Sequence, residues 1–495
     1  MIATHLPVLQ VVIPLLAAPL CLLLHRGPAC WALSLAVSWA ALAIALTLLW
    51  QVMSGGPISY PLGGWAPPWG IEYRLDALGG FVLVIVAAIG AVVIVFARRS
   101  IAHEVAGDRQ YLFYALYLLC LTGMLGIVIT GDVFKLFVFL EIFSLAAYAM
   151  VALGRDRRAL TAAFQYLVMG TIGATFYVIG IGLLYMMTGT LNMADLAQRL
   201  PQVAETRTIL VALAFLTVGM SLKLALFPLH LWLPNAYCYA PSMVTAFLAA
   251  TATKVGAYVL LRIFFTVFGA AYVFEAMPVG KILMTLAILA MFAASTVAIF
   301  QNDVKRMLAY SSVAQIGYIV LGISFASVTG LTGGIVHLFN HAVTKGALFL
   351  VLGCVFLRLG SVRLDDMAGL GRAMPLTMAA FVVGGLSLIG IPLTVGFISK
   401  WYLILAAFEA GWWPVAVLVV ASSLLAVVYV WRVVEVVYFQ PAAGGNAQAV
   451  REAPLDMLIP VWILIAATVY FGLGLPPQPV GVAGRAAALL LGTGP

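Results

Sequence analysis

Ionisable side chains inside long apolar segments are the residues of this sequence that could do chemistry. They are Glu141, Lys223, Lys254, His337, His341, Lys345 and Lys400. His337, His341 and Lys345 recur at intervals of four residues, so they would form one stripe along one helix face. Carboxyl, imidazole and amine groups can each take up and release a proton, and they are costly in apolar surroundings. The set therefore predicts a proton relay.

The number of lysines decides between a relay and a simple ion pair. A lysine at a helix centre costs roughly 2.5–3.5 kcal/mol on membrane-insertion scales, so five central charged groups cost roughly 12 kcal/mol or more. An ion pair between Glu141 and Lys223 would account for one acid and one base, but four central lysines face one central acid. The other lysines must therefore be partly neutral, hydrated or alternately protonated.

Two prolines stand beside lysines within apolar segments. Pro228 follows Lys223 by five residues, and Pro392 precedes Lys400 by eight. A proline lacks the backbone donor, so it leaves a carbonyl free and unwinds the helix locally. We expect helix breaks at both prolines, although a proline also kinks many ordinary membrane helices.

Some polar residues near the relay admit two interpretations. Ser311, Ser312 and Gln315 could hold water for a proton wire or bond between helices, and the sequence leaves both open. His337 and His341 could share a metal ion, since histidines four residues apart can do so. No neighbouring acid or cysteine would complete such a site, so we expect no metal there.

Composition sets the class of protein that must position these residues. Hydrophobic residues make up 64% of the 495, charged residues 8%, and the mean hydropathy is +1.14. Soluble proteins carry about 25% charged residues. The five cysteines form no CxxC pair, and no basic tract indicates nucleic-acid binding. These features exclude a soluble domain and predict an all-α integral membrane protein of about fourteen transmembrane helices.

The expected spans follow from apolar runs of about 20 residues. They are 6–24, 30–50, 77–97, 111–130, 132–153, 160–187, 208–231, 241–266, 280–300, 304–324, 329–357, 374–408, 411–438 and 455–475. Loops after odd-numbered spans hold fourteen Lys and Arg, the opposite side holds six including Arg262, and the remaining five are lysines within spans. By the positive-inside rule both termini face outward from the cell (inner) membrane.

The two prolines also indicate an internal repeat. Pro228 and Pro392 lie 164 residues apart with five spans from one to the next, and an odd offset inverts the second copy. The resulting organisation is 1–110 for helices one to three, 111–266 for the first five-helix repeat, 280–438 for the second, and 439–495 for helix fourteen and a short tail.

Spaced motifs then make the chain recognisable over roughly residues 70–440. They are TGDVFKLFVFLEIFSL, SLKLALFPLHLWLPNAYCYAPS, TKVGAYVLLR, QNDVKRMLAYSSVAQIGY, HLFNHAVTKGALFL and GIPLTVGFISKWY. With these the chain resembles the antiporter-like subunits shared by respiratory complex I, membrane-bound hydrogenases and Mrp-type multisubunit cation/proton antiporters. Chain length and GDVFKLFVFLE are most similar to the D-type subunit of the Mrp antiporters.

The resemblance implies fourteen helices, two inverted five-helix repeats, and broken helices seven and twelve. It also implies a modulating pair of Glu141 and Lys223, a central relay lysine at Lys254, and a terminal group at Lys400. The histidine positions of span eleven fall at His337 and His341, and Lys345 follows them. Complex I relatives use glutamate where this chain has Lys400, and Lys135 stands where a neutral residue is expected. Lys135 could alter ion entry or simply snorkel.

The preferred functional hypothesis is a proton-translocating subunit of a multisubunit Na⁺ or K⁺/proton antiporter, with other membrane subunits as partners. The alternative is a proton-pumping membrane subunit of a complex I-like NADH:quinone oxidoreductase or a membrane-bound hydrogenase. A non-conducting scaffold is a third possibility, which the unpaired lysines disfavour. The sequence has no cofactor motif, so redox chemistry would come from partners.

Overall fold

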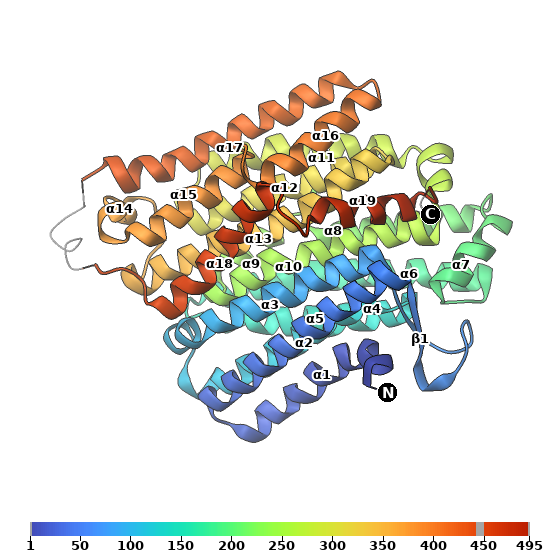
Figure 1. Cartoon of the computed structure of the whole chain (residues 1–495), viewed down its shortest axis with the longest axis horizontal. Coiled ribbons are helices and arrows are strands. Elements are labelled where there is room, and N and C mark those ends of the chain that lie inside the picture. Colours follow the sequence, from blue (N-terminus) through green and yellow to red (C-terminus); the bar gives the residue numbers. More distant parts are fainter. Residues whose placement is uncertain (1, 442–449, 494–495) are drawn as a thin grey trace.

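The computed structural model describes residues 2–441 and 450–493, and long helices running in one general direction make up most of it (Figure 1). The helices of the first part are α1 (Leu6–Leu24), α2 (Gly27–Gly55), α3 (Ala77–Glu104), α4 (Gln110–Ile129), α5 (Val133–Ala152), α6 (Arg158–Thr188), α7 (Met193–Arg199), α8 (Arg207–Leu224), α9 (Trp232–Tyr239) and α10 (Ser242–Leu261). Those of the second part are α11 (Val279–Ile299), α12 (Val304–Ser324), α13 (Val328–Leu359), α14 (Leu370–Ala373), α15 (Pro375–Ile389), α16 (Val395–Glu409), α17 (Trp413–Phe439), α18 (Leu455–Gly472) and α19 (Pro479–Leu490).

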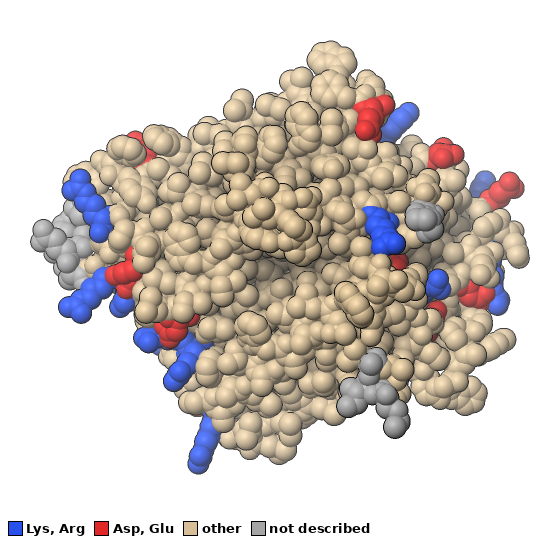
Figure 2. Space-filling model, in the orientation of Figure 1, with Lys and Arg blue, Asp and Glu red and all other residues tan. Residues whose placement is uncertain are grey.

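The predicted all-α membrane architecture is confirmed. Within the described ranges, thirteen helices are long and apolar enough to cross a membrane. The predicted span 374–408 corresponds to two helices of 15 residues each, α15 and α16, separated by a non-helical segment. Lys, Arg, Asp and Glu gather at the two ends of the bundle in Figure 2 and leave an uncharged belt between them, as a hydrocarbon layer requires.

Two helices form the centre of the bundle. Every residue of α10 is buried, and α13 packs against α3, α10, α12, α15, α16, α18 and α19. The outer helices α2 and α17 lie on opposite sides of this core (Figure 1) and keep large apolar side chains such as Trp50 and Leu424 exposed. Polar side chains such as Lys254 on α10 and Lys345 on α13 are therefore removed from solvent.

The two marked chain ends lie at the same end of the bundle, here called the termini end (Figure 1). It also carries the antiparallel hairpin of β1 (Ile58–Pro61) and β2 (Glu72–Leu75), in which Ile58 pairs with Leu75. The C-terminal helix α19 packs along α13 and α3 through a face of small residues. The predicted segment 439–495 thus adds α18 and α19, and its residues 442–449 lie outside the described part.

A pair of backbone hydrogen bonds ties the start of α5 to the segment after α6 at the termini end. The amide of Val133 donates to the carbonyl of Leu191 over 2.9 Å, and the amide of Met193 donates to the carbonyl of Gly131 over 2.9 Å. Between them Asp132 caps α5 by accepting from the amide of Lys135.

The same pair of bonds recurs 171 residues later, between the start of α12 and the segment after α13. Val304 donates to Val362 over 3.0 Å, and Leu364 donates to Asn302 over 2.8 Å, with Asp303 as the helix cap. The first pair adjoins the strand that leads into α3, whereas the second adjoins the region where α3 ends. The two pairs therefore stand at opposite ends of the bundle.

Arg262, counted from the sequence with the basic residues of loops and span ends, lies buried within the bundle. The chain continues past α10 as a π-helix, Arg262–Val267, so Arg262 belongs to a membrane-spanning helix. Its side chain is 8% exposed and makes two bonds of 2.5 and 2.6 Å to Asp76, the residue that caps α3. Tyr258, one turn earlier, accepts a further bond from its Nε at 2.9 Å. Burial alone would raise the pKa of Asp76, but Arg262 and the amide of Gly79 hold that pKa below its usual range.

We expect Arg262→Gln to lower the free energy of unfolding by about 3–5 kcal/mol, because it leaves a buried carboxylate without its partner. Since the folded pKa of Asp76 is depressed, the contribution of the pair is present at neutral pH and is lost on acidification. The difference from wild type should therefore shrink as the pH falls below about 4. Thermal denaturation in detergent at several pH values measures this. Arg74→Gln, which removes a half-exposed arginine 4.0 Å from Glu72, is the control and should change stability by at most about 1 kcal/mol.

Candidate proton-relay site

Glu141 and Lys223 form a close pair between α5 and α8. The Nζ atom of Lys223 lies 3.4 Å from Oε1 of Glu141 and donates to Oγ of Ser144 over 2.8 Å. The lysine side chain is 5% exposed and that of the glutamate 26%. This contact is the ion pair that the sequence offered for one acid and one base.

Lys223 lies in the last turn of α8, directly before the helix break. The helix stops at Leu224, Ala225 has a φ of 59°, and the segment 225–231, which contains Pro228, is not α-helical. Trp232 returns to donate from its indole to the carbonyl of Leu222 over 3.0 Å. The carbonyl end of a helix carries partial negative charge, so it favours a cation in its last turn.

Lys254 and Lys345 are fully buried and have neutral partners. Lys254 donates to the carbonyl of Ala249 and lies 3.4 Å from the hydroxyl of Thr253. Lys345 donates to the carbonyl of Leu308 over 2.9 Å and to Oγ of Ser311. Within the described residues, neither amine has a carboxylate within ion-pair distance.

His337 and His341 differ sharply in their partners. His337 is bonded on both sides, through Nδ1 to Oγ of Ser399 at 2.8 Å and through Nε2 to Oε1 of Gln315 at 3.0 Å. His341 is buried with its ring centroid 6.4 Å from that of His337, and neither of its nitrogens has a partner within the described part of the chain. It lies within electrostatic reach of Lys254 and Lys345.

Ser399 can serve both protonation states of His337. Its hydroxyl also lies 3.0 Å from the carbonyl of Gly396. When Nδ1 is bare, the hydroxyl can donate to it; when Nδ1 carries a proton, the ring donates to Ser399 and the hydroxyl turns to Gly396. A proton can thus arrive or leave with a rotation of one hydroxyl.

Lys400 reaches back across the second helix break. Its Nζ donates to the carbonyls of Leu388 and Ile389, the last two residues of α15, over 3.1 and 2.7 Å. It also donates to Oγ of Ser423 over 2.9 Å and lies 4.7 Å from the ring centre of Tyr318. The non-helical segment 390–394, which holds Pro392, therefore leaves carbonyls at the end of α15 without helical donors, and Lys400 donates to them.

The helices that carry the candidate residues contact one another, one after the next, across the bundle. The Glu141–Lys223 pair joins α5 to α8, which packs on α10; α10 packs on α13, and α13 packs on α16. The row thus passes from Glu141 at one side, through the two central helices, to Lys400 at the other.

The structure separates the remaining polar candidates. Ser311 and Gln315 bond across to α13, whereas Ser312 donates only to the carbonyl of Leu308 in its own helix. Lys135 places its Nζ 4.9 Å from the ring centre of Tyr73, so it contacts the hairpin and no relay residue. The described residues include no group of three or more His, Cys, Asp or Glu side chains that could hold a metal ion.

Sequence reasoning did not single out several side chains that contact the site, among them Ser144, Ser399, Tyr318 and Ser423. Ser144 follows Glu141 by three residues and Ser399 precedes Lys400 directly, so helix periodicity and adjacency could have indicated them. Tyr318 and Ser423 come from α12 and α17, and no local pattern relates them to Lys400.

Comparison with known proteins identifies the family. The profile described as NADH:quinone oxidoreductase/Mrp antiporter, TM, matches residues 130–426. The chain belongs to this family. The N-type subunit of the NADH-quinone oxidoreductase of Desulforudis audaxviator is 45% identical to it, over 95% of this chain and 96% of that protein.

Antiporter proteins are similar to the same chain. The D-type subunit of the Na(+)/H(+) antiporter of Alkalihalophilus pseudofirmus is 31% identical, over 88% of this chain and 87% of that protein. A chain of the Mrp complex from Dietzia sp. DQ12-45-1b has a TM-score of 0.90 at 27% identity, covering 99% of this chain and 98% of that one. The family is thus shown, with relatives of both the redox and the antiporter kind.

We expect Ser399→Ala to lower the free energy of unfolding by about 1–3 kcal/mol, because it leaves Nδ1 of a buried histidine without a partner. Chemical denaturation of the purified protein in detergent measures the change. Ser312→Ala on α12 is the matched control, since its hydroxyl bonds only within its own helix, and it should alter stability by less than about 0.5 kcal/mol. Equal losses for the two variants would contradict the assigned role of Ser399.

Proposed function

We propose that this family member is the proton-translocating membrane subunit of a multisubunit monovalent cation/proton antiporter. The observation that carries the proposal is the row of buried amines and imidazoles on contacting helices, with a single carboxylate, Glu141, in contact with one of them. A structural ion pair needs equal numbers of acids and bases. An excess of amines held by neutral oxygens is what a chain of exchangeable protons needs.

The geometry suggests how such a relay would be driven. A carboxylate near an amine favours its charged form, and loss of that contact inside a low-dielectric bundle disfavours it. At 3.4 Å the Glu141–Lys223 contact is longer than a tight ion pair, and Ser144, one turn further along α5, accepts a closer bond from the amine at 2.8 Å. A small separation of α5 from α8 would unload Lys223. The membrane potential supplies about 2.3 kcal/mol per charge per 100 mV for the transfer that follows.

We also propose the two inverted repeats, 111–266 and 280–438, as the framework of the relay. The backbone bonds at the start of α5 and of α12 support this, because they recur at constant spacing and at opposite ends of the bundle. In each repeat the fourth span is the broken one, as α8–α9 and as α15–α16. The residues of each break would then face the relay from opposite directions.

We expect Glu141→Gln and Lys223→Ala each to lower antiport at least about tenfold, because each removes one half of the modulating pair. The assay is collapse of a pH gradient by Na⁺ or K⁺ in inverted vesicles that contain the complete complex. Lys281→Gln, at the exposed start of α11, is the control and should retain wild-type activity. Undiminished antiport in Lys223→Ala, with normal assembly, would remove that lysine from the relay.

A second function is favoured by a specific observation, the 45% identity to the N-type subunit of an NADH-quinone oxidoreductase. In that case the chain would be the proton-pumping membrane subunit of a complex I-like enzyme or a hydrogenase. The same vesicles distinguish the two. Acidification driven by an electron donor, with no response to Na⁺ or K⁺, and co-purification with flavin or iron–sulfur subunits would establish the redox pump.

Either function places other membrane subunits beside this one. Exposed large side chains on the outer helices, such as Trp39 and Trp431, would contact lipid or those subunits. We further propose that the termini end faces outward, because most basic loop residues lie at the opposite end. Alkaline phosphatase fused after residue 495 should be active, and the same enzyme inserted after Arg157 should be inactive. The reverse pattern would invert the assigned orientation.

A further inference from the structure

A cavity of about 590 Å³ opens at the end of the bundle opposite to the termini. It lies where the two proposed repeats meet, between the end of α3, the α5–α6 segment, the α9–α10 junction, the start of α12 and the segment after α13. The relay residues do not line it. Exposed Arg155 and Arg158 stand at its edge, so the cavity is accessible from outside the bundle.

Basic side chains outnumber acids in this cavity. Its lining includes Arg155, Arg158, Lys305, Arg306 and Arg363 against Glu104, Asp156 and Asp303. Each acid is already engaged by its own neighbours. Glu104 accepts from the amide and hydroxyl of Ser242, and Asp303 accepts from the amide of Arg306 as a helix cap.

The third acid, Asp156, is bound to Arg158. Its Oδ2 atom lies 2.6 Å from Nη2 of that arginine, and its Oδ1 also accepts from the backbone amide. These bonds from Arg158 hold the pKa of Asp156 below its usual range, so the acid is charged at neutral pH. The guanidinium of Arg306 then has only neutral acceptors among the described residues.

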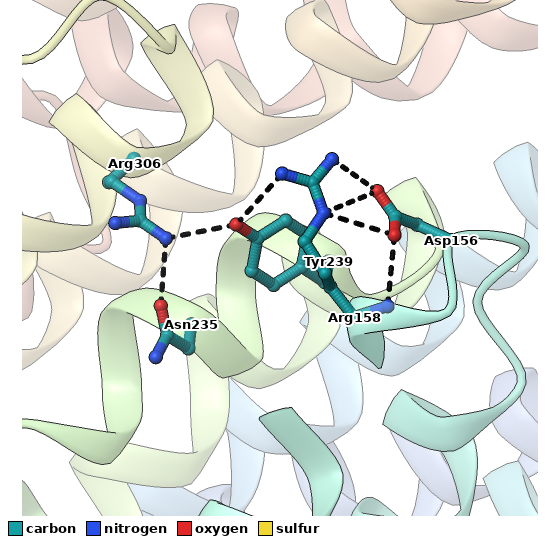
Figure 3. Close-up of polar contacts among 5 residues, drawn as sticks. All are labelled: Asp156, Arg158, Asn235, Tyr239 and Arg306. Atoms are coloured by element: carbon teal, nitrogen blue, oxygen red, sulfur yellow. Dashed lines mark hydrogen bonds and ion pairs between the residues drawn. The ribbon is translucent and has the colours of Figure 1, made fainter. Parts of the chain in front are cut away.

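Two guanidinium groups converge on one phenol oxygen in this cavity (Figure 3). Arg306 donates to the hydroxyl oxygen of Tyr239 over 3.1 Å, and Arg158 donates to the same atom over 3.4 Å. Arg306 also donates to Oδ1 of Asn235 over 2.8 Å. Like charges repel, so two arginines that share one neutral oxygen make a place where an anion would be stabilised.

We propose that this cavity binds a phosphate group, held between Arg306 and Arg158 beside Tyr239. A guanidinium presents a planar fork of donors that matches phosphate oxygens. Arg306 can offer such a fork, and Arg158, whose Nε and Nη2 are bonded to Asp156, can offer its Nη1. Lys305, whose Nζ is buried and bonded to Ser242 at 3.1 Å, adds positive charge to the inner wall. The phosphate comes either from the headgroup of an anionic phospholipid or from a free phosphate ion.

The position of the site connects it to the relay, and this consequence rests on the proposed function. Arg306 lies in the first turn of α12, which also carries Ser311, a partner of Lys345. Its bond to Asn235 ties α12 to α9, the helix that follows the break after Lys223. A phosphate that draws Arg306 away from Asn235 would loosen this link and change the rate of ion exchange.

The binding test uses the complete purified complex and three variants of this chain. Wild-type complex should retain phosphatidylglycerol over phosphatidylcholine in native mass spectrometry, or gain thermal stability from millimolar inorganic phosphate. Arg306→Gln should reduce the retained lipid or the phosphate shift at least about fivefold. Asp156→Asn should strengthen it, because Arg158 loses its competing carboxylate. Arg157→Gln, an exposed neighbour that does not line the cavity, should equal wild type.

The opposite signs keep the test informative if a variant is poorly folded, since misfolding cannot strengthen binding. Retention of phosphatidylglycerol with no response to inorganic phosphate assigns a lipid headgroup, and the reverse assigns the free ion. Equal behaviour of Arg306→Gln, Asp156→Asn and Arg157→Gln in both measurements overturns the site. Antiport in vesicles with and without phosphatidylglycerol is a separate readout. Binding without an effect on rate removes the coupling and leaves the site. The antiporter assignment is tested independently, by the response to Na⁺ or K⁺ and by Glu141→Gln and Lys223→Ala.

Discussion

A hydrocarbon layer offers no hydrogen-bond partners, so every backbone group and every amine inside this bundle must be satisfied by the chain itself. Broken helices and buried lysines each violate that requirement when taken alone. Together they meet it, since a break exposes carbonyls and a lysine brings donors. Lys400 donates to the last two carbonyls of α15, whereas Lys223, in the last turn of α8, donates to Ser144 and Glu141 on α5. At the second break the lysine and the exposed carbonyls therefore satisfy each other.

The chemical character of the partners gives this arrangement its use. A carboxylate would fix a nearby amine in its charged form, whereas hydroxyl and carbonyl oxygens accept from an amine in either state. Among the described residues, Lys254, Lys345 and Lys400 donate to such neutral oxygens alone, and Ser399 can reverse its bond to His337. Glu141 is the exception, and its place beside Lys223 is the reason for proposing that contact as the point of control.

The helices that carry the proposed relay are fixed at the bundle ends by charges and backbone bonds. Asp132 and Asp303 cap α5 and α12 at opposite ends, each between two backbone bonds to a later segment. At the termini end Asp76 and Arg262 tie α3 to the continuation of α10. At the other end Arg306 links α12 to α9 within a cavity of excess positive charge. The Asp76–Arg262 ion pair and the cationic cavity thus lie at opposite ends of the bundle.

The sequence by itself determined the membrane class, the family and the ionisable candidates, because apolar runs, prolines and buried charges are read from local order. It also indicated an internal repeat. It could not supply Ser423 or Tyr318 as partners of Lys400, nor the burial of Arg262, nor the separation of Lys135 from the relay. Those depend on which helices become neighbours and on where each helix stops, and packing between segments far apart in the chain decides both. A side chain's type sets whether it can exchange a proton, whereas its neighbours set which protonation state it holds. The tertiary structure alone therefore decided that these residues lie on helices that contact one another.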